Sequence, residues 1–143
     1  MNSKVDKRNK LNNLNGKDWI KSTKSYWLSE KSKEDKISFK HPAPFLVKDI
    51  EKLISFFSKK NQFILDPFNG VGTTLLACCN TNRKGYGIDL NKEYCKVAKS
   101  RIVDLKNYKN QKIICGDSLK TISKLEKKID YCVTSPPYHN ILQ

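Results

Sequence analysis

Apolar positions recur three or four residues apart in the stretch that follows two prolines at positions 42 and 44. Proline is tolerated in the first turn of a helix but not in its interior, so these two favour a helix start. The recurring positions are Leu46, Ile50, Leu53, Ile54 and Phe57. Such spacing places them on one helical face. It predicts an amphipathic helix that ends at about Ser58.

Beyond this helix, short apolar runs alternate with segments of helical pattern. The runs are Phe63–Leu65, Tyr86–Ile88, Lys112–Cys115 and Ile129–Val133. The first connection contains a helix over Leu75–Cys79. In the second, Asn91 is the expected N-cap, and Tyr94, Ala98, Ile102 and Leu105 share one face. The third follows Asp117 and carries Leu119, Ile122 and Leu125. Strands that alternate with helices predict an α/β protein with a mainly parallel sheet and right-handed crossovers.

The first forty residues differ from the rest. They are polar, show no regular periodicity, and contain large side chains that either dock on the rest of the protein or stack on nucleic-acid bases. These are Trp19, Ile20, Tyr26, Trp27 and Leu28. We therefore divide the chain into a basic polar segment, 1–40, and a domain, 41–143.

The chain is strongly basic. It has 143 residues, 28 Lys and Arg, 14 Asp and Glu, and a formal net charge of +14. Residues 1–40 are densest in positive charge, with 11 basic and 5 acidic side chains. This balance fits a polyanion such as DNA, because bound phosphates release condensed counterions. A lysine- and asparagine-rich composition of the source genome explains the charge equally well.

Several protein classes are excluded by length and composition. The length suits about one domain, and no apolar run approaches the roughly 20 residues of a membrane span. The first ten residues also lack the apolar core of a signal peptide, so we expect a cytoplasmic protein without membrane contact. The five cysteines show no CxxC spacing, and neither a disulfide framework nor a metal site is expected. Most lie in apolar runs, and Cys132 in particular is expected in the core.

A glycine-containing turn follows the first predicted strand, in the segment Asp66-Pro67-Phe68-Asn69-Gly70-Val71-Gly72-Thr73-Thr74. Such a turn lets a ligand approach the backbone and the free amides at a helix start. It is also an ordinary strand-to-helix connection. No Gly-Lys-Ser/Thr follows, and Leu75 stands where the dinucleotide fingerprint has its third glycine. Nucleoside triphosphates and NAD are therefore disfavoured.

The next two strands also end in acidic residues. Asp89 lies 23 residues after Asp66, where a carboxylate can accept both ribose hydroxyls of an adenosine ligand. It could equally provide negative charge at a helix start. Asp117 could bind an adenine amino group or cap the following helix. Together the three acidic ends indicate an adenosine-containing ligand without a phosphate chain, because carboxylates would repel phosphates.

The fourth strand ends in Thr134-Ser135-Pro136-Pro137-Tyr138. The two prolines donate no backbone hydrogen bond and stop the strand, which leaves nearby carbonyl groups as acceptors. Acceptors beside an aromatic ring suit a planar base with an exocyclic amino group. A simple proline turn is the alternative.

In this order, the motifs resemble those of S-adenosylmethionine-dependent DNA amino-methyltransferases, which methylate N4 of cytosine or N6 of adenine. The resemblance covers residues 41–142 and includes His41-Pro42-Ala43-Pro44-Phe45 before the glycine turn. It implies a Rossmann-like class I methyltransferase fold. It also implies that S-adenosylmethionine is held by His41, Pro42, Ala43, Phe45, Asp66, Pro67, Phe68, Gly70, Gly72, Thr73, Asp89, Asp117 and Ser118.

The same resemblance assigns catalysis to Ser135, Pro136, Pro137 and Tyr138, with DNA as the substrate and the target base flipped out of the duplex. A serine before the two prolines is more similar to the N4-cytosine enzymes than to the N6-adenine enzymes. An inactive fragment that binds cofactor or nucleic acid is the alternative. Members of the family continue with three more strands and a target-recognition region. We therefore expect a truncated product, or a partial domain whose sheet a second polypeptide completes.

Overall fold

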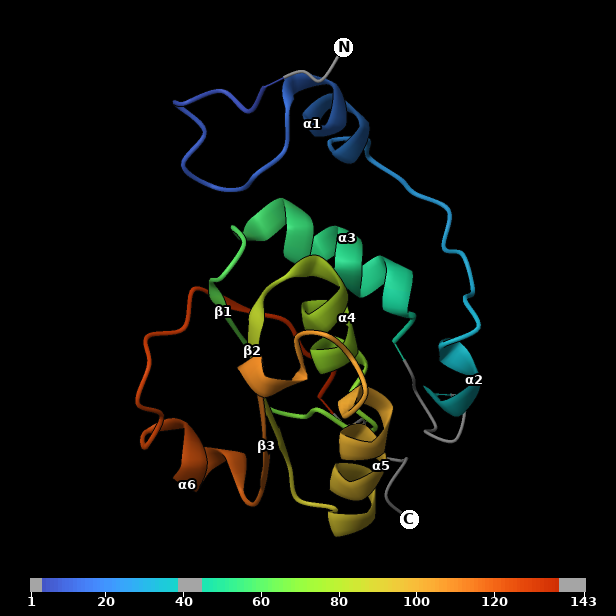
Figure 1. Cartoon of the computed structure of the whole chain (residues 1–143), viewed down its shortest axis with the longest axis vertical. Coiled ribbons are helices and arrows are strands. Elements are labelled where there is room, and N and C mark those ends of the chain that lie inside the picture. Colours follow the sequence, from blue (N-terminus) through green and yellow to red (C-terminus); the bar gives the residue numbers. More distant parts are fainter. Residues whose placement is uncertain (1–3, 39–44, 137–143) are drawn as a thin grey trace.

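A four-stranded parallel sheet forms the centre of the protein, which the computed structural model describes over residues 4–38 and 45–136 (Figure 1). The strands are β1 (Phe63–Asp66), β2 (Lys84–Asp89), β3 (Gln111–Cys115) and β4 (Tyr131–Cys132). Their order in the sheet is β3-β2-β1-β4, and every neighbouring pair is parallel. The predicted α/β architecture is confirmed, and each of the four apolar runs contributes a strand.

β1 and β3 are each one residue longer than predicted, and the other two strands differ more from the predicted ranges. β2 begins at Lys84 rather than Tyr86, because Gly85 remains in register with Ile64 of β1. The glycines at 85 and 87 alternate with large side chains, so one face of β2 has almost no side-chain bulk. β4 has only two residues, although the N–H of Val133 still donates to the carbonyl oxygen of Leu65 at 3.1 Å.

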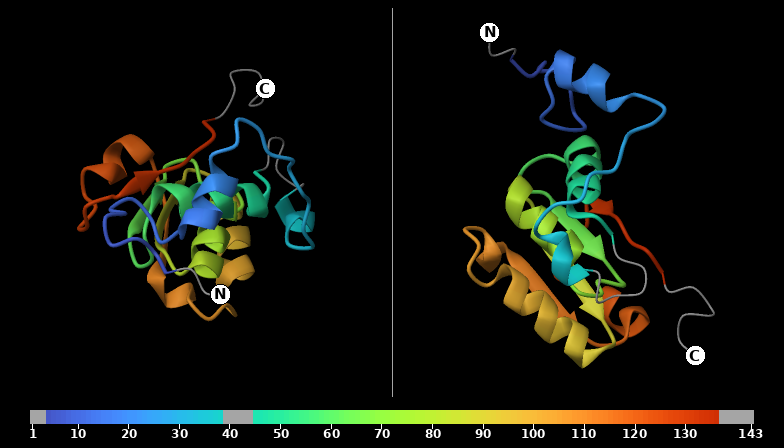
Figure 2. Two further views of the ribbon diagram at one scale, coloured as in Figure 1. Left: turned by 90° about the horizontal axis from the view of Figure 1, so that it is seen from above. Right: turned by 90° about the vertical axis from the view of Figure 1, so that its right-hand side faces the viewer.

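Helices cover both faces of the sheet (Figure 2). One face carries α3 (Val47–Phe57), α4 (Thr73–Thr81) and α5 (Lys92–Ile102). There Ile50 and Ile54 of α3 pack with Ile64 and Val133, and a neighbouring cluster joins α4 and α5. The other face carries α6 (Ser118–Ile122), and its core consists of Leu65, Tyr86 and Ile88. A 3-10 turn, η1 (Tyr108–Asn110), precedes β3.

The helix predicted to end at about Ser58 is α3, for which Ser58 is the C-cap. In α5 the predicted N-cap is confirmed, because the side chain of Asn91 accepts hydrogen bonds from the N–H groups of Glu93 and Tyr94. Among the described residues, no helix is both long enough and apolar enough to cross a membrane.

The N-terminal segment contains two short helices that hydrophobic periodicity did not predict, α1 (Gly16–Ser22) and α2 (Asp35–Ser38). Local hydrogen bonding defines α1, because the Asn15 side chain accepts from the N–H of Asp18 at 3.0 Å. Trp19 packs against Phe56 of α3 with ring centroids 5.2 Å apart, so this side chain docks on the body.

The cysteines divide into two groups. Cys78 and Cys79 are buried, as expected from their apolar run, and Cys95 is buried as well, whereas Cys115 and Cys132 are exposed. The expectation of a core thiol is therefore wrong for Cys115 in the Ile-Ile-Cys run, and it is also wrong for Cys132. Its strand is at the edge of the sheet and pairs only with β1 among the described residues, so its side chain lacks a neighbouring strand on one side.

Candidate active site

The carboxyl ends of β1 and β4 meet where the strand order reverses. From β1 the chain proceeds to β2 and β3 on one side, and β4 then returns to the other side of β1. In open parallel sheets, ligands bind outside the carboxyl ends of the strands at such a switch point. The glycine loop, the acidic strand ends and the start of the Ser-Pro-Pro segment all lie at this edge.

The loop from β1 to α4 has a backbone that requires glycine. Gly70 and Gly72 have φ angles of 50° and 84°, in the left-handed region. A Cβ atom on Gly72 would lie 2.6 Å from the Cβ of Ala98 in α5. The N-cap of α4 is Gly72, which has no side chain that could cap the first turn of the helix.

Asp66 is buried at the centre of the site, with 2% of its surface exposed. Its Oδ2 accepts a hydrogen bond from the hydroxyl of Thr74. Its Oδ1 accepts from the Thr134 hydroxyl at 2.8 Å and from the N–H of Phe68 at 3.1 Å. Burial raises the pKa of Asp66, and these hydrogen bonds oppose the rise. Both oxygens therefore have partners inside the protein.

Asp89 fastens the glycine loop to the end of β2. Its Oδ2 accepts from the N–H of Gly70 at 2.7 Å, and its Oδ1 accepts from the N–H of Asn91 at 2.9 Å. The carboxylate is half-buried. Each oxygen has a second lone pair, so a diol could still bind at the accessible side.

At the end of β3, Asp117 caps α6, because its Oδ1 accepts from the N–H of Leu119 at 2.9 Å. Of the two roles considered for Asp117, adenine binding and helix capping, the structure shows the cap. The second carboxylate oxygen lies 4.0 Å from the ammonium group of Lys120. Ser118 donates from its hydroxyl to the carbonyl oxygen of Pro67. The third strand end is thereby joined to the glycine loop.

Other predicted cofactor residues take different positions. Phe68 is 44% exposed and is available to a ligand. Phe45 packs instead against the core cluster of Ile50 and Ile54. The hydroxyl of Thr73 is buried and accepts from the guanidinium of Arg101 at 3.1 Å.

The predicted catalytic segment is described in part. Ser135 is half-buried and Pro136 is exposed, directly after the Thr134 contact with Asp66. Pro137 and Tyr138 lie outside the described residues, as do His41, Pro42 and Ala43 of the proline-rich motif.

Four polar residues of this site were missed from sequence: Asn69, Thr74, Arg101 and Thr134. The glycine turn offered a sequence signal for Asn69 and Thr74, which belong to it. Nothing in the sequence indicated Arg101. Its guanidinium donates a hydrogen bond to the carbonyl oxygen of Val71 at 2.8 Å, although the two residues are 30 positions apart in the sequence.

Asn69 provides a test of whether this edge suits a ligand. It is 5% exposed, and neither its Oδ1 nor its Nδ2 has a hydrogen-bond partner among the described residues. A Cβ atom placed on Gly87 would lie only 2.5 Å from the Cγ of Asn69. The Asn69 amide therefore occupies space that is open because residue 87 is a glycine. A buried polar group without a partner is costly. Together with the acidic groups at the strand ends, it suits a cationic nucleoside such as S-adenosylmethionine.

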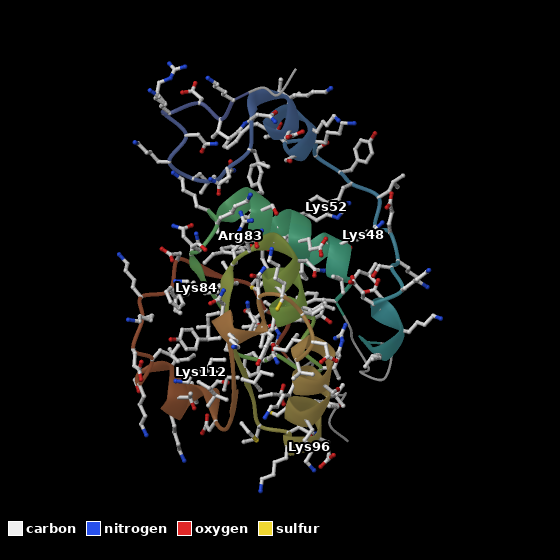
Figure 3. All side chains as sticks on the ribbon, in the orientation of Figure 1. Lys48, Lys52, Arg83, Lys84, Lys96 and Lys112 are labelled. Carbon is white, nitrogen blue, oxygen red and sulfur yellow. The ribbon has the colours of Figure 1, made fainter. Side chains whose placement is uncertain are left out.

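A separate groove of about 840 Å³ lies between residues 21–30 and α3. It is lined by Tyr26 and Trp27 and by lysines that include Lys48 and Lys52 of α3 (Figure 3). Lys48 forms an ion pair with Glu30 at 2.9 Å, and Lys52 lies 5.8 Å from the ring centroid of Trp27. The large side chains of this segment that remain exposed thus lie away from the strand ends.

Comparison with known proteins assigns the family. The model of the DNA methylase family N6_N4_Mtase matches residues 1–100. The orphan methyltransferase M.BamHII of Bacillus amyloliquefaciens is 44% identical over 79 residues, which are 55% of this chain and 29% of the relative. The type II methyltransferase M2.LlaDCHI of Lactococcus lactis subsp. cremoris is 40% identical over 83 residues, 57% of this chain and 31% of the relative. The chain thus aligns with less than a third of each relative.

Solved structures agree on the fold. TTHA0409 of Thermus thermophilus, described as a DNA modification methylase, superposes with a TM-score of 0.55 at 25% identity, over 71% of this chain and 40% of that one. TrmN of Thermus thermophilus gives 0.59 at 19% identity, over 77% and 34%. These likenesses confirm the Rossmann-like fold. With the family model covering most of its length, the chain belongs to the S-adenosylmethionine-dependent DNA methylases of the N6/N4 amino-methyltransferase type.

Proposed function

We propose that this chain binds S-adenosylmethionine at the carboxyl ends of its strands and takes part in methylating the exocyclic amino group of a flipped DNA base. The observation that carries this proposal is the direct bonding among the strand ends. The N–H of Gly70 donates a hydrogen bond to the carboxylate of Asp89. The hydroxyl of Ser118 donates to the carbonyl oxygen of Pro67, and the hydroxyl of Thr134 donates to the carboxylate of Asp66. A site assembled from four strand ends is suited to hold two ligands against each other, and such positioning supplies a large part of catalysis.

Each residue has a chemically distinct role in this proposal. Asp89 accepts the ribose hydroxyls and Asp117 the adenine amino group, while the glycine loop and Phe68 contact the methionine part. The donor supplies an electrophilic methyl group on a sulfonium. The Ser135 side chain and the Pro136 carbonyl accept hydrogens from the target amino group, which orients the nitrogen lone pair. Phe68 presents an aromatic face to positive charge.

We further propose N4 of cytosine as the target, with N6 of adenine as the alternative. The support is the resemblance of Ser135-Pro136-Pro137-Tyr138 to the N4-cytosine version of the motif. Methylated DNA digested to nucleosides and analysed by mass spectrometry separates the two, because N4-methylcytosine and N6-methyladenine differ in mass. Recovery of N6-methyladenine alone would overturn the cytosine assignment.

A second polypeptide that pairs with β4 is also proposed. Two observations support this proposal. Among the described residues β4 pairs with β1 alone, and the nearby Phe57 is 42% exposed. Edge strands with apolar neighbours readily accept a further strand. Co-purification of a chain that restores methyl transfer would support this proposal, whereas methylation by the isolated chain would contradict it.

The decisive test of the cofactor site is calorimetric titration of the purified chain with S-adenosylmethionine and S-adenosylhomocysteine. We expect binding in the micromolar range that is lost in Asp89→Ala. Asp104→Ala is the matched control, because it removes an exposed acidic side chain after α5 and should bind normally. A chain with the circular dichroism of a folded α/β protein that binds neither compound would refute the assignment. In a preparation that transfers methyl groups, such as the complex with the completing chain, Ser135→Ala should keep cofactor binding and abolish methyl transfer; if transfer persists, the role of Ser135 is wrong.

A further inference from the structure

One buried carboxylate joins the cofactor loop to the strand end that carries Ser135. Asp66 accepts from Thr74 in α4 through one oxygen and from Thr134 and Phe68 through the other. Thr134 directly precedes Ser135. The carboxylate thus contacts the start of α4, the glycine loop and the segment after β4 at once.

The Thr134 hydroxyl is the outermost contact of this segment. Among the described residues, the last backbone hydrogen bond between the segment after β4 and β1 runs from the N–H of Val133 to the carbonyl oxygen of Leu65, at 3.1 Å. Beyond it the backbone enters Pro136, which has no N–H to donate. The 2.8 Å hydrogen bond from Thr134 to Asp66 therefore extends the attachment to β1 as far as the residue before Ser135.

The hydrogen bond is also important for the carboxylate. Asp66 is almost fully buried, and the groups that act on it electrostatically do not favour its charge: they are Asp89 at the end of β2, Cys78 on α4 and Cys132 on β4. No cationic group acts on it among these. A buried carboxylate without a cation depends on hydrogen-bond donors, so loss of the Thr134 donor should be costly.

We propose that Thr134 is a positioning residue: through Asp66 it ties the segment bearing Ser135 to the glycine loop, so that filling the cofactor site and fixing Ser135 are energetically linked. The link itself follows from the contacts on Asp66. The naming of its two ends as cofactor site and base site rests on the proposed function.

The link can be tested without any ligand by a double-mutant cycle in urea unfolding. Thr134→Val should lower the unfolding midpoint in the wild-type background and much less in Asp66→Ala, which removes both acceptor oxygens, and Thr134→Ser should retain the wild-type midpoint. Thr81→Val is the matched control, because Thr81 also loses a hydroxyl donor, to the carbonyl oxygen of Ala77 at the far end of α4. Its effect should be the same in both backgrounds. Equal effects of Thr134→Val in both backgrounds would overturn the link.

The linkage to the cofactor can be followed at Cys132, an exposed thiol two residues before Thr134. Cys115 is the other exposed thiol, so the experiment uses a Cys115→Ser background. The remaining thiols, Cys78, Cys79 and Cys95, are buried and therefore react more slowly than Cys132, and burial raises the pKa of Cys79 to about 11.

Saturating S-adenosylhomocysteine should slow modification of Cys132 by about fivefold or more, the lower limit of ordinary coupling between two sites. Thr134→Val should remove this protection at saturating ligand and change the affinity for S-adenosylhomocysteine by no more than the same factor, because coupling between two sites is reciprocal, and Thr134→Ser should restore the protection. Binding with equal protection in wild type and Thr134→Val overturns the inference. Absence of binding by the folded wild type refutes the proposed function instead, and the unfolding cycle still decides whether the link exists.

Discussion

At the scale of single residues, the site depends on positions where only one side chain fits. Gly72 combines a left-handed backbone with a close approach to α5, and each of these excludes a Cβ atom. Asp66 combines deep burial with several hydrogen bonds. Substitution at either position should therefore affect the whole edge of the sheet.

Replacement of Gly72 by alanine should lower the free energy of unfolding by at least about 2 kcal/mol, from left-handed backbone strain together with the clash with Ala98. Urea denaturation followed by circular dichroism measures the change. Gly16→Ala is the matched control, because a Cβ atom there meets nothing within 4 Å at the start of α1. It should leave stability unchanged or slightly raised. Equal losses for the two variants would contradict the geometry of the loop.

Asp66 should also shape the pH dependence of stability. Burial raises its pKa in the folded protein above the ordinary value of 3.8, so the folded state binds its proton more tightly than the unfolded state does. This contribution is fully present below pH 3.8 and is lost as the pH rises through the folded pKa. Asp66→Asn should remove that component, so its unfolding midpoint should decline less between mildly acidic and neutral pH. Parallel pH profiles of the two proteins would contradict the burial of a charged Asp66.

At the scale of elements, α5 connects the glycine loop with the N-terminal segment. Arg101 near its end donates to the carbonyl oxygen of Val71 at 2.8 Å and to that of Glu34 at 3.0 Å. Nearby, the buried Asp35 accepts from the N–H of Val47 at the start of α3. The basic segment is thus attached through side chains that bond to backbone carbonyl and amide groups.

Arg101→Ala should destabilise the protein by roughly 1–3 kcal/mol, because it removes the guanidinium donor from the carbonyl oxygen of Val71, a residue that is 4% exposed. It should also speed proteolysis within residues 1–38, which mass spectrometry of a limited digest would show. Arg8→Ala serves as the control. Arg8 forms an exposed ion pair with Asp6 at 2.8 Å, and such pairs add little to stability. A digest pattern that does not distinguish the two variants would mean that Arg101 does not anchor the segment.

Periodicity predicted the body of the fold well but its details less so. The strands and α3 to α5 were predictable because the apolar spacing records which face is buried. For α6 the helix was predicted but its buried face was not, because Leu119 is 88% exposed. Three other features of the structure could not be predicted from apolar spacing. The helix α1 depends on a cap, Cys132 is exposed because β4 is an edge strand, and Thr134 contacts Asp66 across 68 residues of sequence. Strand order and long-range side-chain bonds leave no periodic trace in a single sequence.

For the candidate site, the structure brings the predicted glycine loop, Asp89 and Ser118 together by hydrogen bonds at one edge of the sheet, and their roles toward a cofactor stay a prediction. The individual roles were less predictable. Asp66 was expected to contact the cofactor, yet its oxygens are engaged by Thr74, Thr134 and Phe68. The sequence of a strand end shows that a carboxylate is present but not which neighbours its burial brings to it.

At the scale of the whole molecule, a net charge of +14 should govern the interaction with DNA. The lysines labelled in Figure 3 are spread over several elements: Lys48 and Lys52 lie on α3, Lys84 on β2 over the ring of Phe63, and Lys112 on β3 near α6. We expect the affinity for duplex DNA, measured by fluorescence anisotropy, to fall about tenfold or more between roughly 50 and 200 mM salt. An affinity independent of salt would exclude phosphate contacts as its source and favour compositional bias as the origin of the charge.

The strand order also has a consequence for how the protein is made. β1, β2 and β3 can pair one after another as they leave the ribosome, because each new strand joins the one before it. The other side of β1 stays open until residues 131 and 132 emerge, a delay that spans more than 60 residues of synthesis. Closing so long a loop carries an entropic cost. The contact between Asp66 and Thr134 therefore forms late, and nascent chains released before it forms should expose an unpaired strand to chaperones.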